Sequence, residues 1–303
     1  MTDPLNPAPV TALPVTAASV TAAPLETARY EALLARLREM APLVVAFSGG
    51  VDSSFLLRAA VDAVGASTSL GGQDPVRAVI GVSPSLQASN LAFARRFAAD
   101  LGVPLDEAPT NEFANPAYIE NGPDRCYHCK DALYGLLRGL VERAPDGRIL
   151  DGTNHDDLAD VRPGRAAARL HGVESPLAEL GWTKLEIRDA SRRLGLTGWD
   201  RPASPCLSSR IPHGTPVTIE SLARIARAED ALHRLGFLDV RVRHHGDVAR
   251  IEAPTQDFTR LLERREAAVQ AVQAAGYRWV TLDLHGYRPA GQAWVESAQK
   301  ESR

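Results

Sequence analysis

The sequence predicts an α/β fold in which a doubly wound parallel sheet is followed by a second, smaller α+β unit. From residue 26 to residue 205, apolar runs of strand length alternate with amphipathic helical segments, the βαβαβ order of a parallel sheet. The first run, Leu43 to Phe47, holds five consecutive apolar residues, as expected of a strand buried on both faces. After residue 212 the order changes to helix, strand, strand, helix, strand, which indicates the smaller unit.

Length and composition agree with a globular protein of two domains. The 303 residues, 45% of them hydrophobic, are enough for a sizeable core, and no run approaches the roughly 20 apolar residues of a membrane span. A net charge of -3 argues against a strongly basic nucleic-acid surface. We therefore expect a soluble protein with a small-molecule substrate and neither a membrane nor a nucleic-acid partner. A homo-oligomer is compatible with these features.

Composition also sets the expected domain limits. Residues 1–25 are mostly Ala, Pro, Thr and Val and lack the basic start of a secretory signal, so we expect a disordered tail. We assign residues 26–205 to the larger domain, 206–290 to the smaller one, and 291–303 to a tail without a core pattern. Three cysteines, an odd number in a chain without an export signal, favour a reducing cytoplasm and metal or sulfur chemistry.

The elements of the larger domain follow from periodicity and from helix breakers. Residues 26–40 carry apolar side chains at helical spacing. Thr183, with Glu186 three residues later, predicts a capping box. Lys184 beside it could contact a phosphate or could be a solvated lysine. The sequence alone favours the solvated lysine. The other elements expected here are the strands Arg77–Val82, Pro104–Ala108 and Arg148–Gly152 and the helices Ala88–Leu101 and Lys130–Arg143.

The smaller domain follows a linker from Pro202 to Pro216, and glycines mark its turns. In Val240-Arg241-Val242-Arg243, the alternation places both valines on the core face and both arginines on the other face. The elements expected are the helix Ile219–Leu235, the strands Val240–Arg243 and Val248–Glu252, the helix Thr255–Ala274 and the strand Arg278–Leu284.

A small polar turn follows the first strand, with the sequence Ser48-Gly49-Gly50-Val51-Asp52-Ser53-Ser54. Its glycines let backbone amides approach a ligand, and its end lies where a helix N-terminus favours phosphate. An ordinary strand-to-helix turn with a serine cap uses the same residue types. The whole stretch resembles the PP-loop of the ATP pyrophosphatases, which have an adenine nucleotide alpha hydrolase-like fold. The resemblance implies cleavage of ATP between its α and β phosphates, with Asp52 on the Mg²⁺ ion. The residues implied around the leaving pyrophosphate are Ser48, Gly49, Gly50, Asp52, Ser53 and Ser54.

A second polar turn follows the last strand of the sheet. Asn154 and Asp156 suit helix caps in this turn. Its similarity to the Gly-Thr-Asn-x-Asp-Asp turn of PP-loop enzymes implies instead that Gly152 and Thr153 lie near the nucleotide and that Asp156 or Asp157 lies near the magnesium.

The three cysteines, Cys126, Cys129 and Cys206, are expected in loops, the first two just before a helix. Core packing does not need them there. Four interpretations are open: inert thiols, a dithiol redox pair, a zinc site with His128 or His155 as fourth ligand, and an iron–sulfur cluster with three protein ligands. Three thiolates would leave one iron of a four-iron cluster without a protein ligand, and this iron could hold a sulfide. The sulfide could then act as a nucleophile toward an acid that ATP has adenylated.

Several stretches between about residue 28 and residue 290 are similar to the LarE family of sulfur transferases, which act in the synthesis of a nickel-pincer nucleotide cofactor. The resemblance implies AMP transfer from ATP to a carboxylate of a pyridinium mononucleotide, followed by replacement of the adenylate by sulfur to give a thiocarboxylate. The stretches are the PP-loop, Leu150–Gly152 with Asp160–Gly164 after it, Cys206–Arg210, Val240–Arg243, Ala249–Glu252 and Gly276–Leu284.

Two versions of this chemistry are known in the family. In one, the cysteine at the position of Cys206 gives up its own sulfur and becomes dehydroalanine. In the other, three cysteines carry a [4Fe-4S] cluster that relays sulfide. The single-cysteine version lacks the Cys-x-x-Cys pair that is present here as Cys126 and Cys129, so we expect the cluster version, with Asp52 and all three cysteines in catalytic roles.

The resemblance also suggests how the substrate phosphate is held. Guanidinium groups pair with phosphate, although a solvated strand face is the simpler explanation of Arg241 and Arg243. With the resemblance, both become candidates for the substrate phosphate, together with Arg210 and Arg288. Two acidic residues match family positions near this site and are expected to orient the arginines or bind metal, namely Glu229 and Glu252.

Two other functions are weighed against this one. A tRNA-thiolating enzyme of the same superfamily would need a basic RNA-binding surface or an added zinc module, and neither the charge nor the cysteine count supplies one. A non-catalytic nucleotide- or metal-binding module would bind ATP without releasing pyrophosphate.

Overall fold

A four-stranded parallel sheet is the central feature of the structure, a computed structural model that describes residues 28–66, 74–141, 147–159, 163–202 and 205–287. The strand order is β3-β2-β1-β4. The strands are β1 (Leu43–Ala46), β2 (Val76–Val82), β3 (Leu105–Pro109) and β4 (Arg148–Asp151). The predicted α/β fold is therefore confirmed, whereas the predicted tails lie outside the described residues and the domain limits stay predictions.

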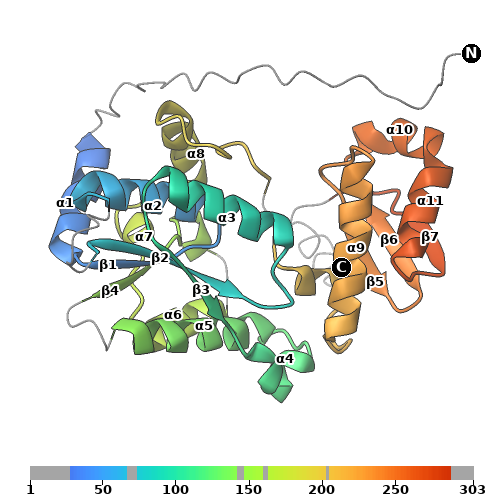
Figure 1. The fold of residues 1–303 in the computed structure, drawn as a ribbon, viewed down its shortest axis with the longest axis horizontal. Coiled ribbons are helices and arrows are strands. Elements are labelled where there is room, and N and C mark those ends of the chain that lie inside the picture. The colour runs from blue at the N-terminus through green and yellow to red at the C-terminus, as the bar shows by residue number, and fades with distance from the viewer. Residues whose placement is uncertain (1–27, 67–73, 142–146, 160–162, 203–204, 288–303) are drawn as a thin grey trace, which may run out of the picture.

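Helices cover both faces of this sheet (Figure 1). Buried side chains of α1, α2, α3, α7 and α8 form the core on one face, and α5 and α6 cover the other. The helices are α1 (Ala28–Met40), α2 (Val51–Val64), α3 (Ala88–Asp100), α4 (Pro116–Ile119), α5 (Arg125–Val141), α6 (Gly164–Leu170), α7 (Pro176–Glu179) and α8 (Lys184–Arg193), with the 3₁₀ turns η1 (Glu112–Ala114) and η2 (Asp156–Leu158). Within the described ranges, no helix is long and apolar enough to span a membrane.

The strand order gathers four loops at one edge of the sheet. Because all four strands are parallel, the loops that follow them meet at their carboxyl ends. The chain runs from β1 outward through β2 to β3, and β4 then pairs with the other side of β1. Ala46 at the end of β1 lies level with both Val79 and Asp151. This reversal between β1 and β4 is the position at which open α/β sheets bind ligands.

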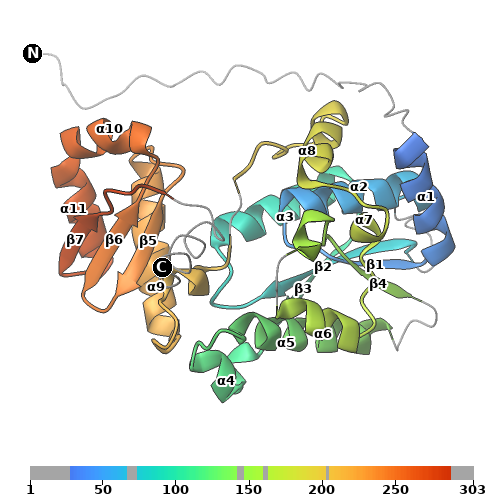
Figure 2. The same cartoon turned by 180° about the vertical axis from the view of Figure 1, so that it is seen from behind.

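A second sheet of three strands follows in the order β5-β6-β7, with β5 and β6 antiparallel and β6 and β7 parallel. Val240 and Val242 are fully buried in its core, which confirms the predicted alternation. Its elements are η3 (Leu207–Arg210), α9 (Ile219–Arg234), β5 (Arg241–His245), β6 (Val248–Glu252), η4 (Thr255–Asp257), α10 (Phe258–Glu263), α11 (Arg265–Ala274) and β7 (Trp279–Leu282). The segment that leads into α9 lies between the two sheets (Figure 2).

Two predicted helices differ from the structure. Helix α5 begins at Arg125 instead of Lys130, so the prediction that Cys126 and Cys129 lie in a loop is wrong. Its start is set by the helix breakers Gly122 and Pro123, because no residue after them interrupts a helix. The predicted helix from 255 to 274 is broken into η4, α10 and α11, with Arg264 at φ −101° and ψ 18° between the last two.

Candidate functional site

Serine hydroxyls close the loop between β1 and α2. Ser48 Oγ accepts a hydrogen bond from Gly50 N at 3.3 Å and lies 3.1 Å from Ser53 Oγ, which in turn donates to Gly50 O at 3.1 Å. Gly49 has a φ of 71°, which a side chain would strain. Because α2 begins after a glycine, no side-chain cap satisfies its first N–H groups. The loop therefore presents a helix N-terminus suited to an anion.

Asp52, in the first turn of α2, has one paired and one unpaired oxygen. Its Oδ2 accepts a hydrogen bond from Lys184 Nζ at 2.5 Å, whereas Oδ1 is buried without a partner among the described residues. A buried carboxylate oxygen without a partner suits a hard cation, so the side chain fits the predicted Mg²⁺. The interpretation of Lys184 as a solvated lysine is wrong, because the chain folds this residue back onto Asp52.

The capping box predicted at the start of α8 positions that lysine. Thr183 and Glu186 exchange hydrogen bonds in both directions, as expected. The backbone N–H of Lys184 donates to Asp156 Oδ2 at 2.8 Å. The start of α8 is thus tied both to α2 and to the turn after β4.

That turn touches α2 through its backbone. A Cβ on Gly152 would lie only 2.8 Å from Ser53 N, so nothing larger than glycine fits there without a shift. Further along the turn, Asn154 and Asp157 cap each other: Asn154 N donates to Asp157 Oδ2 at 3.1 Å, and Asp157 N donates to Asn154 Oδ1 at 3.2 Å. Thr153 N donates to Asp151 Oδ1 at 3.1 Å.

The three thiols converge from two segments. Cys126 and Cys129 lie three residues apart on α5 and share one face, and Cys206 immediately precedes η3. Burial raises the pKa of Cys129 to about 12, and the charges of Cys206, then of Glu112 and Cys126, contribute. Cys129 also packs against the apolar cluster that contains Leu207, the residue next to Cys206, so the two segments are neighbours.

No group of three or more His, Cys, Asp or Glu side chains surrounds a single metal ion in the part of the chain that the structure describes. His128, a predicted zinc ligand, lies instead 3.2 Å from both Asp124 Oδ2 and Asn115 Nδ2. The predicted zinc site is therefore not formed among the described residues, and the [4Fe-4S] cluster stays a prediction.

Glu112 is a residue of this site that sequence analysis missed. It lies in η1, just after β3, and is 1% exposed. Neither of its carboxylate oxygens has a hydrogen-bond partner among the described residues, and its charge contributes to the raised pKa of Cys129. A buried carboxylate without partners is costly for folding, so packing alone does not explain this position.

A buried network of hydroxyls fixes the segment that carries Cys206. Ser85 Oγ lies 2.5 Å from Tyr118 OH, and both lie 2.8 Å from Ser208 Oγ. Leu207 N donates to Ser85 O at 2.9 Å, and Arg125 NH1 donates to Ser208 O at 2.8 Å. The loop after β2 and the helices α4 and α5 thus hold the cysteine segment from one side. The sequence gives no signal for these contacts, which join residues about 80 to 120 positions apart.

Asn121 connects the start of α5 to the same segment. It is fully buried and has a φ of 59°, a conformation that asparagine tolerates better than most residues. Its Nδ2 donates to Pro212 O and to Thr215 O, each at 2.8 Å, and its Oδ1 accepts from Arg125 NH1 at 2.6 Å. The Asn-Gly-Pro sequence is a turn signal that could have indicated this position.

Arg210 holds the cysteine segment from the other side. Its guanidinium is fully buried and pairs with Glu229 through Nε and NH2 at 2.9 and 3.1 Å, while NH1 donates to Pro205 O at 2.7 Å and to Cys206 O at 3.2 Å. Glu229 also accepts from Val242 N at 2.9 Å. Arg210 is therefore engaged with the protein, and its predicted contact with the substrate phosphate stays a prediction.

Arg241 and Arg243 lie on the same side of β5. Burial lowers the pKa of Arg241, and the charge of Arg210 lowers it further. Arg243 donates to Ser209 O at 2.7 Å and to Glu252 Oε2 at 2.8 Å, while its Nε is buried without a partner in the described structure. Two guanidinium groups on one side of a strand suit an anionic substrate group. Arg288 lies outside the described residues.

The loop from β2 to α3 joins the two halves of the site. Ser85 contacts the cysteine segment, and Gln87 Nε2 donates to Glu229 Oε2 at 2.8 Å. Asn90, one turn further along α3, packs against the first loop, since a Cβ on Gly49 would lie 3.4 Å from Asn90 O. The predicted nucleotide loop and the predicted sulfur site are therefore neighbours.

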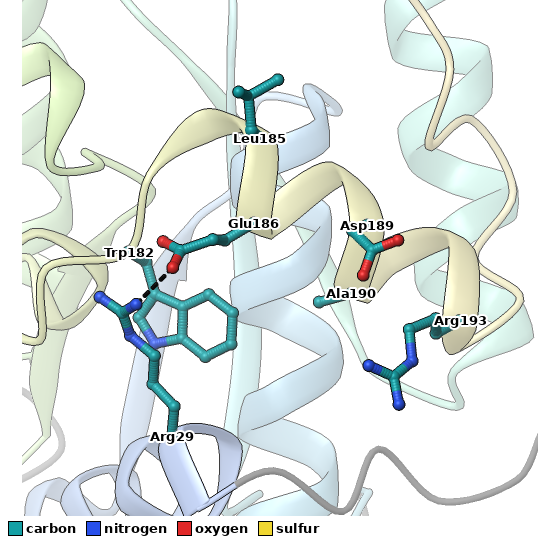
Figure 3. A pocket seen from close by; sticks show the side chains of 7 residues that line it. All are labelled: Arg29, Trp182, Leu185, Glu186, Asp189, Ala190 and Arg193. Atoms are coloured by element: carbon teal, nitrogen blue, oxygen red, sulfur yellow. Dashed lines mark hydrogen bonds and ion pairs between the residues drawn. The ribbon is translucent and has the colours of Figure 1, made fainter.

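A separate pocket of about 390 Å³ lies between α1 and α8 (Figure 3). Arg29 crosses it to Glu186 at 2.5 Å and lies 5.3 Å from the centre of the Trp182 ring. None of the residues predicted to act in chemistry lines this pocket, so we do not assign the site to it.

Comparison with known proteins gives three relatives, and no protein-family model matches the chain. A pyridinium-3,5-bisthiocarboxylic acid mononucleotide synthase of Lactiplantibacillus plantarum is 35% identical over 257 residues, which cover 84% of this chain and 90% of that protein. An uncharacterized protein of Synechocystis sp. is 43% identical over 264 residues, 85% of this chain and 96% of that protein. An uncharacterized protein of Methanocaldococcus jannaschii is 29% identical over 170 residues, 56% of this chain and 66% of that protein.

Proposed function

Because the chain belongs to the LarE family of pyridinium-3,5-bisthiocarboxylic acid mononucleotide synthases, we propose that it is an ATP-dependent sulfur transferase. Its substrate would be a carboxylate of a pyridinium mononucleotide, and its product the corresponding thiocarboxylate of nickel-pincer nucleotide synthesis. One observation carries this proposal. Ser85 contacts the segment of Cys206, and α3, which follows Ser85 in the chain, packs against the loop before α2.

The first step is adenylation at the start of α2. A carboxylate oxygen of the substrate attacks the α-phosphorus of ATP, the bond from this phosphorus to the bridging oxygen breaks, and pyrophosphate leaves with the electron pair. The free N–H groups after Gly50 would bind the leaving phosphates. Asp52 would hold Mg²⁺ through Oδ1, and Lys184 would add a second positive charge at the same place.

The second step replaces AMP by sulfur. A sulfur nucleophile attacks the acyl carbon of the adenylate, and AMP leaves with the electron pair of the C–O bond. Bound by Cys126, Cys129 and Cys206, a [4Fe-4S] cluster would supply an open iron at which sulfide is held. Arg210 and the hydroxyls of Tyr118 and Ser208 would keep the Cys206 segment at that position.

Direct donation from Cys206 is the second candidate, because this thiol is exposed. Its sulfur would attack the acyl adenylate to form a thioester. Loss of the Cα proton and cleavage of the Cβ–S bond would then give the thiocarboxylate and leave dehydroalanine in the chain.

Pyrophosphate release tests the adenylation step. The wild-type chain with ATP, Mg²⁺ and the pyridinium biscarboxylate mononucleotide should release pyrophosphate, and Asp52→Ala should not. Asp189→Ala, at an exposed aspartate of α8 paired with Arg192, serves as the matched control and should behave as wild type. Binding of ATP without pyrophosphate release would indicate a binding module, and release that persists in Asp52→Ala would remove the PP-loop assignment.

Anaerobic purification tests the cluster. Iron and acid-labile sulfide should accompany the wild-type chain, and Cys126→Ala should lose them together with the brown colour. A colourless wild-type chain that still forms thiocarboxylate would exclude the cluster route. In that case the intact mass after turnover should be lower by one hydrogen sulfide if Cys206 gives up its sulfur.

A further inference from the structure

Arg201 lies beside the first loop although it follows α8, about 150 residues later in the chain. Its NH1 group donates to Gly49 O at 3.4 Å, and its NH2 group donates to Asn90 Oδ1 at 3.0 Å. The centre of the guanidinium lies 4.0 Å from the centroid of the Phe93 ring. The side chain thus bridges the loop and the first turns of α3.

The surrounding backbone fixes this side chain in place. Gly198 has a φ of 79°, and a Cβ there would lie 2.8 Å from both Arg201 Cδ and Phe93 Cζ. Only a glycine at position 198 therefore leaves room for the Arg201 guanidinium to stack on the Phe93 ring. The carbonyl of Arg201 accepts a hydrogen bond from Arg188 NH2 at 2.8 Å. An arginine held in this way loses little conformational entropy when it binds a ligand.

The charge of Arg201 is not balanced within the part of the chain that the structure describes. No carboxylate there forms an ion pair with it, and its charged neighbour is another cation, Arg96. Burial lowers the pKa of Arg201, and the charge of Arg96 lowers it further, whereas an arriving anion would offset both effects. Arg95 shows the contrast, because both branches of its guanidinium pair with Glu107, at 2.6 and 2.7 Å.

We propose that Arg201 binds a terminal phosphate of the nucleotide and then the released pyrophosphate. The inference rests on the proposed ATP chemistry at Gly49 to Ser54. Of the five N–H groups of a guanidinium, two are used in the contacts with Gly49 and Asn90. The other three make no hydrogen bond within the described ranges and can donate to phosphate oxygens. The backbone amides of the loop and this side chain would then bind the same anion from two directions.

Binding of inorganic pyrophosphate and of AMP to the full chain tests this assignment. Arg201→Gln removes the charge and keeps a shorter polar side chain, so pyrophosphate should bind about tenfold to a hundredfold more weakly, as expected for a lost hydrogen-bonded charge. AMP, which lacks the terminal phosphates, should bind as tightly as to the wild type. Arg95→Gln, the same change at an exposed arginine of α3 that pairs with Glu107, should alter neither affinity. Arg201→Lys should restore part of the pyrophosphate affinity, because it restores the charge without the planar stack.

Two results would overturn the assignment. One is pyrophosphate affinity in Arg201→Gln equal to that in Arg95→Gln. The other is an equal loss of AMP and pyrophosphate affinity, which would show that Arg201 only supports the loop. Failure of the proposed function looks different: the wild type would bind pyrophosphate through Arg201 yet never release it from ATP in the presence of the pyridinium substrate.

Discussion

Replacing Gly152 by alanine should damage the nucleotide site without removing any of its side chains. The new Cβ would lie 2.8 Å from Ser53 N, 3.0 Å from Ser53 Cα and 3.1 Å from Asp52 C, all backbone atoms in the first turn of α2. Ordinary contact begins at 3.4 Å, so the turn after β4 and α2 must separate by 3.4 − 2.8 = 0.6 Å. Neither backbone can yield easily, because Gly152 directly follows β4 and the first turn of α2 is buried against the sheet.

The size of the effect follows from that separation. Overpacking of this kind lowers the free energy of unfolding by about 1–3 kcal/mol. The carboxylate of Asp52 and the first N–H groups of α2 move with the helix, and a misplacement of about 1 Å costs up to about a hundredfold in rate. We therefore expect pyrophosphate release to fall by at least about tenfold.

Urea unfolding and pyrophosphate release measure the two effects. The control is Gly139→Ala in α5, where a Cβ meets nothing within 4 Å. This substitution should raise the free energy of unfolding by about 0.5–1 kcal/mol, because alanine is the better helix former, and should leave the rate unchanged. A Gly152→Ala chain as stable and as active as the wild type would refute the contact between the two loops.

Three further substitutions test other parts of the structure. Glu229→Gln should lower the free energy of unfolding, measured in urea, by about 3–5 kcal/mol, because it removes the ion pair of the fully buried Arg210. Its control, Glu107→Gln at an exposed ion pair, should lower the free energy of unfolding by under about 1 kcal/mol. Equal losses in the two variants would contradict the account. Lys184→Met should lower pyrophosphate release by about tenfold or more while leaving the unfolding curve near that of wild type, and an unchanged rate would show that the lysine has no part in adenylation. Burial lowers the pKa of His244, so the unfolded chain binds this proton more readily than the folded one. Stability should therefore fall as the pH drops below about 6.5, and His244→Gln should remove that part of the slope.

The features that depend on local patterns were predictable from the sequence. The run from Leu43 gave a buried parallel strand, and the spacing of Tyr30, Leu33 and Leu37 gave a helix whose predicted face is buried. The capping box at Thr183 formed because both of its partners lie within four residues of each other. The loops after β1 and β4 were predictable from motif similarity, because each motif is a short continuous stretch of the sequence.

The contacts between distant segments were not predictable. Lys184 has the pattern of a solvated first-turn lysine, and only the packing of α8 beside α2 brings it to Asp52, 132 residues away. The burial of Glu112 without a partner likewise results from tertiary packing, because a glutamate after a strand is usually exposed. Helix α5 begins five residues before the predicted Lys130, directly after the turn that Gly122 and Pro123 form.

An anaerobic single turnover tests the central claim most directly. The purified chain would be mixed with ATP, Mg²⁺ and the pyridinium biscarboxylate mononucleotide, and pyrophosphate and thiocarboxylate would be measured in the same sample. We predict equal amounts of the two, both absent in Asp52→Ala, with pyrophosphate alone in Cys206→Ala. Thiocarboxylate formed without pyrophosphate, or pyrophosphate from the wild type without any thiocarboxylate, would contradict the account.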